Sequence, residues 1–349
     1  TNSLQTLNAG ADAYNVAIGF ASGAAMTTGQ GNVLVGGLAG DAINSGSGNV
    51  CIGNQAGSAI STASENVVIG QYAGDALTIG TSNVAVGTEA LSTSVDGDHN
   101  TAVGYKALED YEDGDGDGHN TAVGSNSQAN ANTGQFNTSL GSNSLGGNTL
   151  SGDANVALGY KSGFNLSSGA ANTAVGYESL MTEDSHGNNT ALGYSALRIL
   201  NAGAEGHNTA VGSSAGAAMT TGVQNTIVGA EAGDAITTGT HNVAIGFRAL
   251  SAEDTGSNNI GIGYYALNKL NHDANAYNVA LGHIAGSEVT SGVNNTLIGA
   301  LAGDALTTGD NNIIIGYAAA ASAVGADNET VIGTATTTNA IVHGLRKTV

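Results

Sequence analysis

Hydrophobic and polar positions follow one pattern that returns along the chain at a step of 17 residues nearly everywhere. Each copy reads Asn, then Val or Thr, a small or apolar residue, Ile, Val or Leu, and Gly, and a Ser/Thr/Gly-rich return follows. Short runs rich in β-branched residues, bounded by Asn and Gly, are typical of strands, and a helix of this length would lack caps. The pattern predicts one short strand in each copy.

Nineteen such copies follow one another, and we number the asparagine of each copy column one and its glycine column five. The glycine-to-glycine step rises to 20 at 104→124, to 18 at 141→159, and to 19 at 193→212 and 263→282. Repeats of this kind stack as coils about 4.8 Å apart. The fold class expected is therefore all-β: a parallel β-solenoid, or β-roll, of about 19 coils.

The repeat also defines the expected domain organisation. A lead-in at 1–14 precedes a single repetitive domain at 15–333, and a transition segment at 334–349 ends the sequence. Columns one and five are expected to be structural, because stacked asparagines pass hydrogen bonds between coils and the glycine fits a tight backbone approach. A ligand role for each asparagine is the alternative. The first ladder residues predicted are Asn15, Asn32, Asn49, Asn66, Asn83, Asn100, Asn120, Asn137, Gly19, Gly36, Gly53, Gly70, Gly87 and Gly104.

The two faces of the strand carry different side chains. Columns two and four hold Val/Thr and Ile/Val/Leu, and we expect them to fill the inside of the coil. Column three, usually alanine and never charged, is then expected to face outward. A strand that is apolar on both faces is typical of one covered on both faces, which predicts a parallel homo-oligomer. A monomer with an exposed alanine stripe is the alternative.

Composition narrows the partners. The 349 residues include 28 acidic and 7 basic side chains, a formal net charge of −21, which disfavours nucleic acid. No apolar stretch approaches the ~18 residues of a membrane span, so no membrane insertion is expected. The one cysteine, Cys51, is expected to be a small core residue. No nucleophile, zinc-protease or phosphate-loop motif occurs, and the acidic residues are mostly scattered, which disfavours a glycan-cleaving enzyme; a non-enzymatic protein is expected.

The strings "NVAIG", "NTAVG" and "NTALG" resemble the repeat of YadA-like heads of trimeric autotransporter adhesins, and "NTAVGYKAL" is similar to repeats of phage tail-fibre proteins. The resemblance covers residues 15–333. It implies a left-handed β-roll, a homotrimer, and attachment to a cell-surface or host receptor. The terminal "ETVIGTATTTNAIVHGLRKTV" resembles the way a tail-fibre β-roll continues into its next segment. The expected location is extracellular, on a virion tail fibre or a bacterial cell surface.

The stretch "DYEDGDGDGHN" at 110–120 is the strongest candidate for a cation site. Its aspartates alternate with glycines as in the first half of an EF-hand calcium loop, although Gly124 stands where the bidentate glutamate would be. Bound Ca²⁺ is one interpretation, and a solvated acidic loop without a cofactor is the other. The ligands that calcium would use are Asp113, Asp115 and Asp117, with Asp110 and Glu112, and Asp96 and Asp98 of the preceding coil.

Histidine precedes the ladder asparagine in four copies, at His99, His119, His207 and His241. His99 and His119 occur in successive copies, so their rings can stack and, near a trimer axis, can meet a metal. Exposed loop residues are the alternative interpretation.

Surface recognition is expected at the insertion loops 109–119, 145–154, 198–207 and 267–277, because insertions mark the variable face of a solenoid. A purely structural fibre shaft is one alternative function. An ice-binding solenoid is another, suggested by "TTG" at 27, 220, 237 and 307. The receptor-binding candidates are Tyr111, His119, Arg198, Lys269 and His272.

Overall fold

The computed structural model describes residues 2–8, 12–112, 117–203 and 205–334. Within these residues the regular elements are strands of three residues each, one in every copy of the repeat, and no helix is present. The chain divides into two compact units, Thr1–Asn189 and Thr190–Val349. The expected all-β parallel solenoid with a 17-residue repeat is thereby confirmed.

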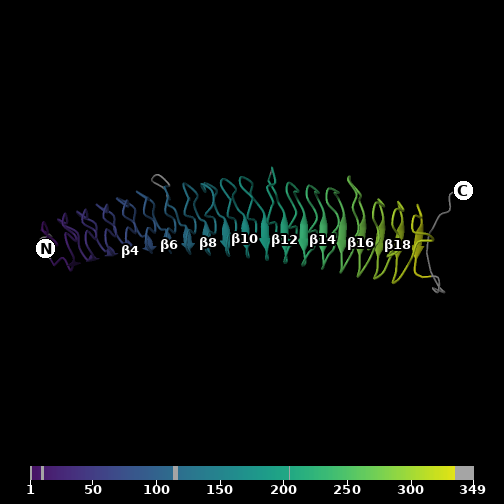
Figure 1. Ribbon diagram of the computed structural model, residues 1–349, viewed down its shortest axis with the longest axis horizontal. Coiled ribbons are helices and arrows are strands. Elements are labelled where there is room, and N and C mark those ends of the chain that lie inside the picture. Colours follow the sequence, from purple (N-terminus) through teal and green to yellow (C-terminus); the bar gives the residue numbers. More distant parts are fainter. Residues whose placement is uncertain (1, 9–11, 113–116, 204, 335–349) are drawn as a thin grey trace. The chain divides into compact units, whose positions relative to one another are not determined.

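In the first unit the strands follow one another in chain order, one to a coil (Figure 1). They are all parallel and pair column with column, so that Val16, Ala17 and Ile18 lie opposite Val33, Leu34 and Val35. The ten strands are β1 (Val16–Ile18), β2 (Val33–Val35), β3 (Val50–Ile52), β4 (Val67–Ile69), β5 (Val84–Val86), β6 (Thr101–Val103), β7 (Thr121–Val123), β8 (Thr138–Leu140), β9 (Val156–Leu158) and β10 (Thr173–Val175).

The second unit repeats the same arrangement, with parallel pairs in the same register; for example, Thr209 lies opposite Thr226. Register survives the longer steps, because the extra residues lie in the returns and not in the strands. Its nine strands are β11 (Thr190–Leu192), β12 (Thr209–Val211), β13 (Thr226–Val228), β14 (Val243–Ile245), β15 (Ile260–Ile262), β16 (Val279–Leu281), β17 (Thr296–Ile298), β18 (Ile313–Ile315) and β19 (Thr330–Ile332).

The asparagine ladder is present and works mainly through the backbone. Asn66 Oδ1 accepts the N–H of Asn83 in the next coil at 2.9 Å. Asn66 Nδ2 donates to the carbonyl of Gly80, 14 residues further on, at 2.9 Å. An asparagine bonded in this way closes its own coil and joins it to the next, which satisfies polar groups that burial would otherwise leave unpaired. At Asn100, Asn189 and Asn259 the amide instead donates to the carbonyl two residues earlier.

The faces of the strand are the reverse of those predicted. Column three points into the coil, where Leu34, Cys51 and Val68 are fully buried. Columns two and four point outward; Ile18 is 61% exposed and Leu140 is 52% exposed. The prediction assigned the larger side chains of columns two and four to the interior. The interior of this thin coil is filled by column three together with a second column, so column three can be as small as alanine where the second column carries a large side chain.

Column nine supplies that volume. In the coils with Leu34, Cys51, Val68, Ile227 and Leu297 at column three, column nine is glycine. A Cβ on Gly40, for example, would lie 2.8 Å from Leu34 Cδ2. Where column three is Ala85, column nine is the buried Leu91. Interiors are close-packed, so the two columns exchange volume from coil to coil.

The coil that holds β12 lies between a coil with a large residue at column nine and a coil with a large residue at column three. It has Ala210 at column three and glycine at column nine. A Cβ on Gly216 would lie 2.9 Å from Leu197 Cδ2 of the preceding coil and 3.1 Å from Ile227 Cδ1 of the following one. The glycine at this junction therefore makes room for large residues of both neighbours.

Glycine at column five is required by a close backbone approach. Gly70 has φ of 138°, and a Cβ there would lie 2.4 Å from the carbonyl oxygen of Gly87. The residue before each asparagine, which we call column zero, adopts a left-handed conformation instead, as at His99 with φ of 56°. Asn and His recur at column zero because they tolerate this region better than most residues do.

Candidate functional site

An outward stripe formed by columns two and four is the main apolar surface of the strands in both units. Neither column carries a charged residue in any strand, although the chain has a formal net charge of −21. Leu192 and Leu281 are 43% and 46% exposed, and Ile52 is 37% exposed. Contiguous apolar surface of this kind is typical of an interaction site. Sequence reasoning found a second apolar face but assigned it to the wrong columns.

Exposed aromatic rings at column six continue the outward stripe beyond the glycine. Tyr160 and Tyr177 stack in successive coils of the first unit with ring centroids 5.4 Å apart. In the second unit Tyr264 stacks on Phe247 at 5.6 Å and on His283 at 5.1 Å. The stacked rings add apolar area beside the aliphatic side chains.

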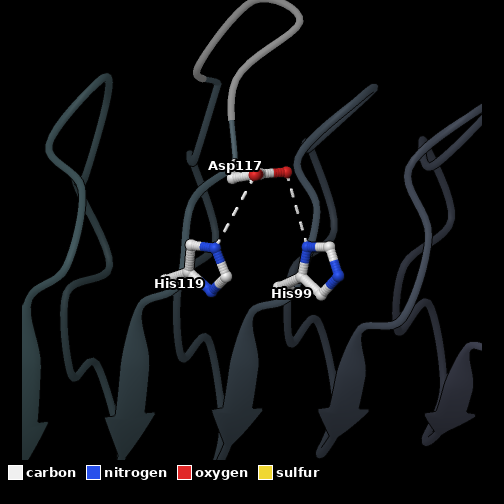
Figure 2. Close-up of side chains that lie close together, drawn as sticks. All are labelled: His99, Asp117 and His119. Carbon is white, nitrogen blue, oxygen red and sulfur yellow. Dashed lines mark ion pairs between the residues drawn. The ribbon is translucent and has the colours of Figure 1, made fainter.

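A cluster of two histidines and one aspartate lies where the first insertion loop rejoins its coil. His99 Nδ1 lies 3.5 Å from Asp117 Oδ1, and His119 Nε2 lies 3.8 Å from Asp117 Oδ2. The two imidazole rings stack with centroids 4.9 Å apart and planes inclined by 16°. Figure 2 shows Asp117 placed across the two rings, with one ring nitrogen of each histidine directed toward it. The expected stacking of the two histidines is thus observed.

The backbone around this cluster is held by the solenoid. Asp98 and Asp117 form a parallel β-bridge, and the N–H of Gly118 donates to the carbonyl of Asp98 at 3.1 Å. The Asp98 carboxylate is occupied elsewhere, accepting from the N–H and the hydroxyl of Thr81. Phe136, at column zero of the next coil, stacks on His119 at 5.5 Å. The side chains of His99, Asp117 and His119 are therefore available to a ligand, whereas Asp98 is directed to Thr81 through its Oδ1 atom.

The calcium hypothesis concerns a segment that is only partly described. Asp113 and Asp115 lie outside the described residues. Asp110 Oδ1 accepts from the Thr93 hydroxyl at 3.2 Å, and the N–H of Glu112 donates to the carbonyl of Asn132 at 2.9 Å. Asp117 pairs with the histidines, as described above, and the calcium site stays a prediction.

The receptor-binding candidates are not all on the surface. Tyr111 is fully buried, so its assignment as a receptor contact was wrong. Its ring fills the core beneath the first insertion loop, where a Cβ on Gly97 would lie 3.0 Å from it. Arg198 is exposed, Lys269 Nζ pairs with Glu288 Oε2 at 2.7 Å, and His272 is half-buried.

Two glutamates lie fully buried in the returns of coils whose column nine is leucine, and sequence reasoning missed both. Glu253 Oε1 accepts from the N–H of Gly256 at 2.9 Å, and burial raises the pKa of this carboxyl to about 7. Glu183 Oε1 accepts from the N–H of His186 at 3.3 Å and lies 3.2 Å from its Nδ1. The signal was present in the sequence as "EDSHG" and "EDTGS" at corresponding positions.

The threonines of the "TTG" strings contribute hydrogen bonds between coils. The Thr220 hydroxyl donates to the carbonyl of Thr237 at 3.2 Å, and that of Thr307 donates to Val324 at 2.9 Å. A different set of threonines faces outward, at column two of β6, β7 and β8. Of the other column-zero histidines, His241 Nδ1 lies 3.0 Å from the hydroxyl of the preceding Thr240.

No protein-family model matches the chain, and a search of curated proteins finds no relative. Among the described residues, no helix has the length and apolar character needed to cross a membrane.

Proposed function

We propose that this chain is a non-enzymatic attachment fibre that works outside the cell as a parallel homotrimer and presents its insertion loops to a cell-surface or host receptor. The observation that carries the proposal is the outward stripe. Its aliphatic side chains lie on the solvent side of every strand, and their burial against a partner is favourable by about 25 cal/mol per Å² of apolar surface.

The repeat itself favours another copy of this chain as the partner. Valine, isoleucine, leucine and threonine recur in the stripe at every coil, so a partner must offer apolar groups at the same axial spacing to cover them all. A parallel copy does so in register. The absence of charge from columns two and four supports the same conclusion, because copies that each carry a net charge of −21 would otherwise bring like charges into contact.

Three-fold closure and attachment come from the resemblance to YadA-like heads and tail-fibre repeats. Closure of the stripe around an axis leaves the insertion loops on the outside, where side chains such as Arg198 and Lys269 would meet a receptor. Three identical loops at each level give multivalent binding, so weak individual contacts suffice.

Light scattering of the purified full chain tests the assembly. We expect a mass three times the 34.0 kDa of the chain. Replacing Ile52 and Leu140 of the outward stripe by aspartate should reduce that mass. The matched control is Ile79→Asp, because Ile79 is 51% exposed and lies outside the strands. A native chain that stays monomeric at every concentration would refute the assembly.

Attachment is tested separately by shortening the four insertion loops so that their coils become plain 17-residue coils, and by measuring adhesion to a panel of whole bacterial cells. The proposal expects the trimer mass to persist and adhesion to be lost. Unchanged adhesion would contradict receptor binding by the loops, and absence of adhesion by the native chain would favour a structural shaft.

Ice binding is the second candidate, favoured by the outward threonines of β6, β7 and β8. It expects thermal hysteresis from the native chain, and its loss on replacement of Thr101, Thr121 and Thr138 by lysine. An attachment fibre shows no hysteresis.

A further inference from the structure

We propose that His99, Asp117 and His119 form a binding site for a divalent transition-metal ion of the zinc type within a single chain. The site does not depend on the proposed function, because all three ligands come from two successive coils of the same chain. The ligand atoms of the three residues all lie within 4.8 Å of one another.

The distances fit a small ion. Zinc binds histidine nitrogen and carboxylate oxygen at about 2.0–2.2 Å, so ligand atoms of a tetrahedral site lie about 3.3–3.6 Å apart. The His99 Nδ1 to Asp117 Oδ1 distance of 3.5 Å is already in that range. The His119 Nε2 atom lies 3.8 Å from the other carboxylate oxygen, Oδ2, so an ion between the two rings either contacts both oxygens of Asp117 or takes one of them after the carboxylate rotates.

The solenoid aligns the ligands in advance. Both histidines occupy column zero with left-handed backbones, φ being 56° at His99 and 48° at His119, so their rings leave the coil in the same direction. Stacking between the rings, and of Phe136 on His119, fixes that direction. The β-bridge between Asp98 and Asp117 then brings the carboxylate to the nitrogen-bearing edges (Figure 2). Such preorganisation reduces the ordering that metal binding requires.

The donor set selects the ion. Two imidazoles and one carboxylate suit Zn²⁺, Co²⁺, Ni²⁺ or Cu²⁺, whereas Ca²⁺ takes six to eight oxygen ligands. Three protein ligands leave a coordination position for water or for a group on a binding partner. The cluster lies at the surface, where the side chains of His99 and His119 are 45% and 43% exposed, so the ion can enter directly.

Column zero also contains a histidine that serves as a control for the metal-binding test. His241 occupies column zero with φ of 59°, but its neighbours in that column are Gln224 and Asn258. It therefore has the same backbone setting as His119 without a second histidine. Asparagine is a suitable replacement throughout, because it adopts this conformation readily and occurs naturally in the column at Asn294 and Asn311.

The experiment is a titration of tag-free, metal-stripped full chain with Zn²⁺ by calorimetry, together with Co²⁺ absorption spectra that report imidazole coordination. We expect one ion per chain for the native protein and for His241→Asn. The variants His99→Asn, His119→Asn and Asp117→Asn should each bind at least about 100-fold more weakly. Thermal unfolding without metal should be unchanged in the asparagine variants, which separates lost ligands from lost folding.

Three results would overturn the proposal. The first is native Zn²⁺ affinity equal to that of the His99→Asn/His119→Asn double variant. The second is one ion per three chains, which would place the ion on an axis between copies. The third is Ca²⁺ binding with equal stoichiometry that Asp117→Asn abolishes and the histidine variants leave intact, which would assign the site to the acidic loop.

Discussion

Replacing Glu253 by glutamine should stabilise the second unit at high pH and leave its stability nearly unchanged at low pH. The carboxyl is fully buried, and its Oε2 atom has no hydrogen-bond partner. Its Oε1 atom accepts from the N–H of Gly256 at 2.9 Å and of His272 at 3.4 Å. Loss of solvation, with a smaller contribution from the charge of Asp254, raises the pKa from 4.5 to about 7, because burial disfavours the charged form.

The sign and size of the effect follow from proton linkage. Between the unfolded pKa of 4.5 and the folded pKa of about 7, the folded state holds more protons than the unfolded state, so stability falls as pH rises through this window. Below the window both states are protonated and the penalty is absent. Above it both are ionised, and the penalty reaches about 3 kcal/mol. Glutamine keeps the acceptor for Gly256 and carries no charge, so it avoids the penalty.

Chemical unfolding of the native chain and of Glu253→Gln at about pH 4 and about pH 9 measures the difference. Hydrogen exchange of the Gly256 and Asn259 amides, compared between the two proteins at each pH, reports the same difference locally, as suits a repeat protein that opens in parts. Glu288→Gln is the control, because this exposed partner of Lys269 contributes little. A Glu253→Gln variant no more stable than the native chain at high pH would refute the argument.

Three further predictions concern the first unit. Asn66→Ala leaves the N–H of Asn83 and the carbonyl of Gly80 unpaired in the core, so it should reduce the free energy of unfolding by about 2–4 kcal/mol. The control, Asn54→Ala at an exposed position, should change it by less than about 0.5 kcal/mol, and denaturant unfolding of both variants checks this. Gly70→Ala should lower the free energy of unfolding by about 3 kcal/mol or more, because its Cβ meets a backbone oxygen. Gly48→Ala, with no atom nearer than 3.8 Å but a left-handed φ of 71°, should lower it by only about 1 kcal/mol, and equal thermal shifts of the two variants would contradict this. Burial raises the pKa of the Cys51 thiol to about 12, so iodoacetamide should label it only after unfolding, and labelling of the native chain at the rate of a free thiol would show that the coil opens.

The strands and the asparagine ladder could be predicted from the sequence because nearly every copy repeats the same short pattern of asparagine, β-branched residues and glycine. Asn66 and Gly70 stand at fixed offsets from a β-branched run, and their stacking needs no knowledge of the other columns. The orientation of the strand could not be predicted from one column alone. Ala85 looks like a surface residue until Leu91 is considered with it, because the interior is shared between columns three and nine.

The candidate cluster was partly predictable. His99 and His119 share a column, so their stacking follows from the repeat. Asp117 was assigned to a calcium loop, and its place beside the rings depends on which residues of the 20-residue step are the extra ones. The bridge pairs Asp98 with Asp117, 19 residues apart, whereas the two histidines are 20 apart, so two of the three extra residues precede Asp117 and the third lies between Asp117 and His119. Residue spacing alone does not contain that information. Tyr111 was misplaced for the related reason that an insertion can also return a side chain to the core.

The glycine at position 216 limits how an array of this kind can change its length. Genes with tandem repeats gain and lose whole copies by unequal recombination, and a coil within a run of like neighbours can be removed without altering the residues that meet in the core. Removing the coil that carries Gly216 would instead bring the coil of Leu197 directly against that of Ile227, two large residues in one layer. Length variants of this protein should therefore differ within runs of like coils and keep the junction coils.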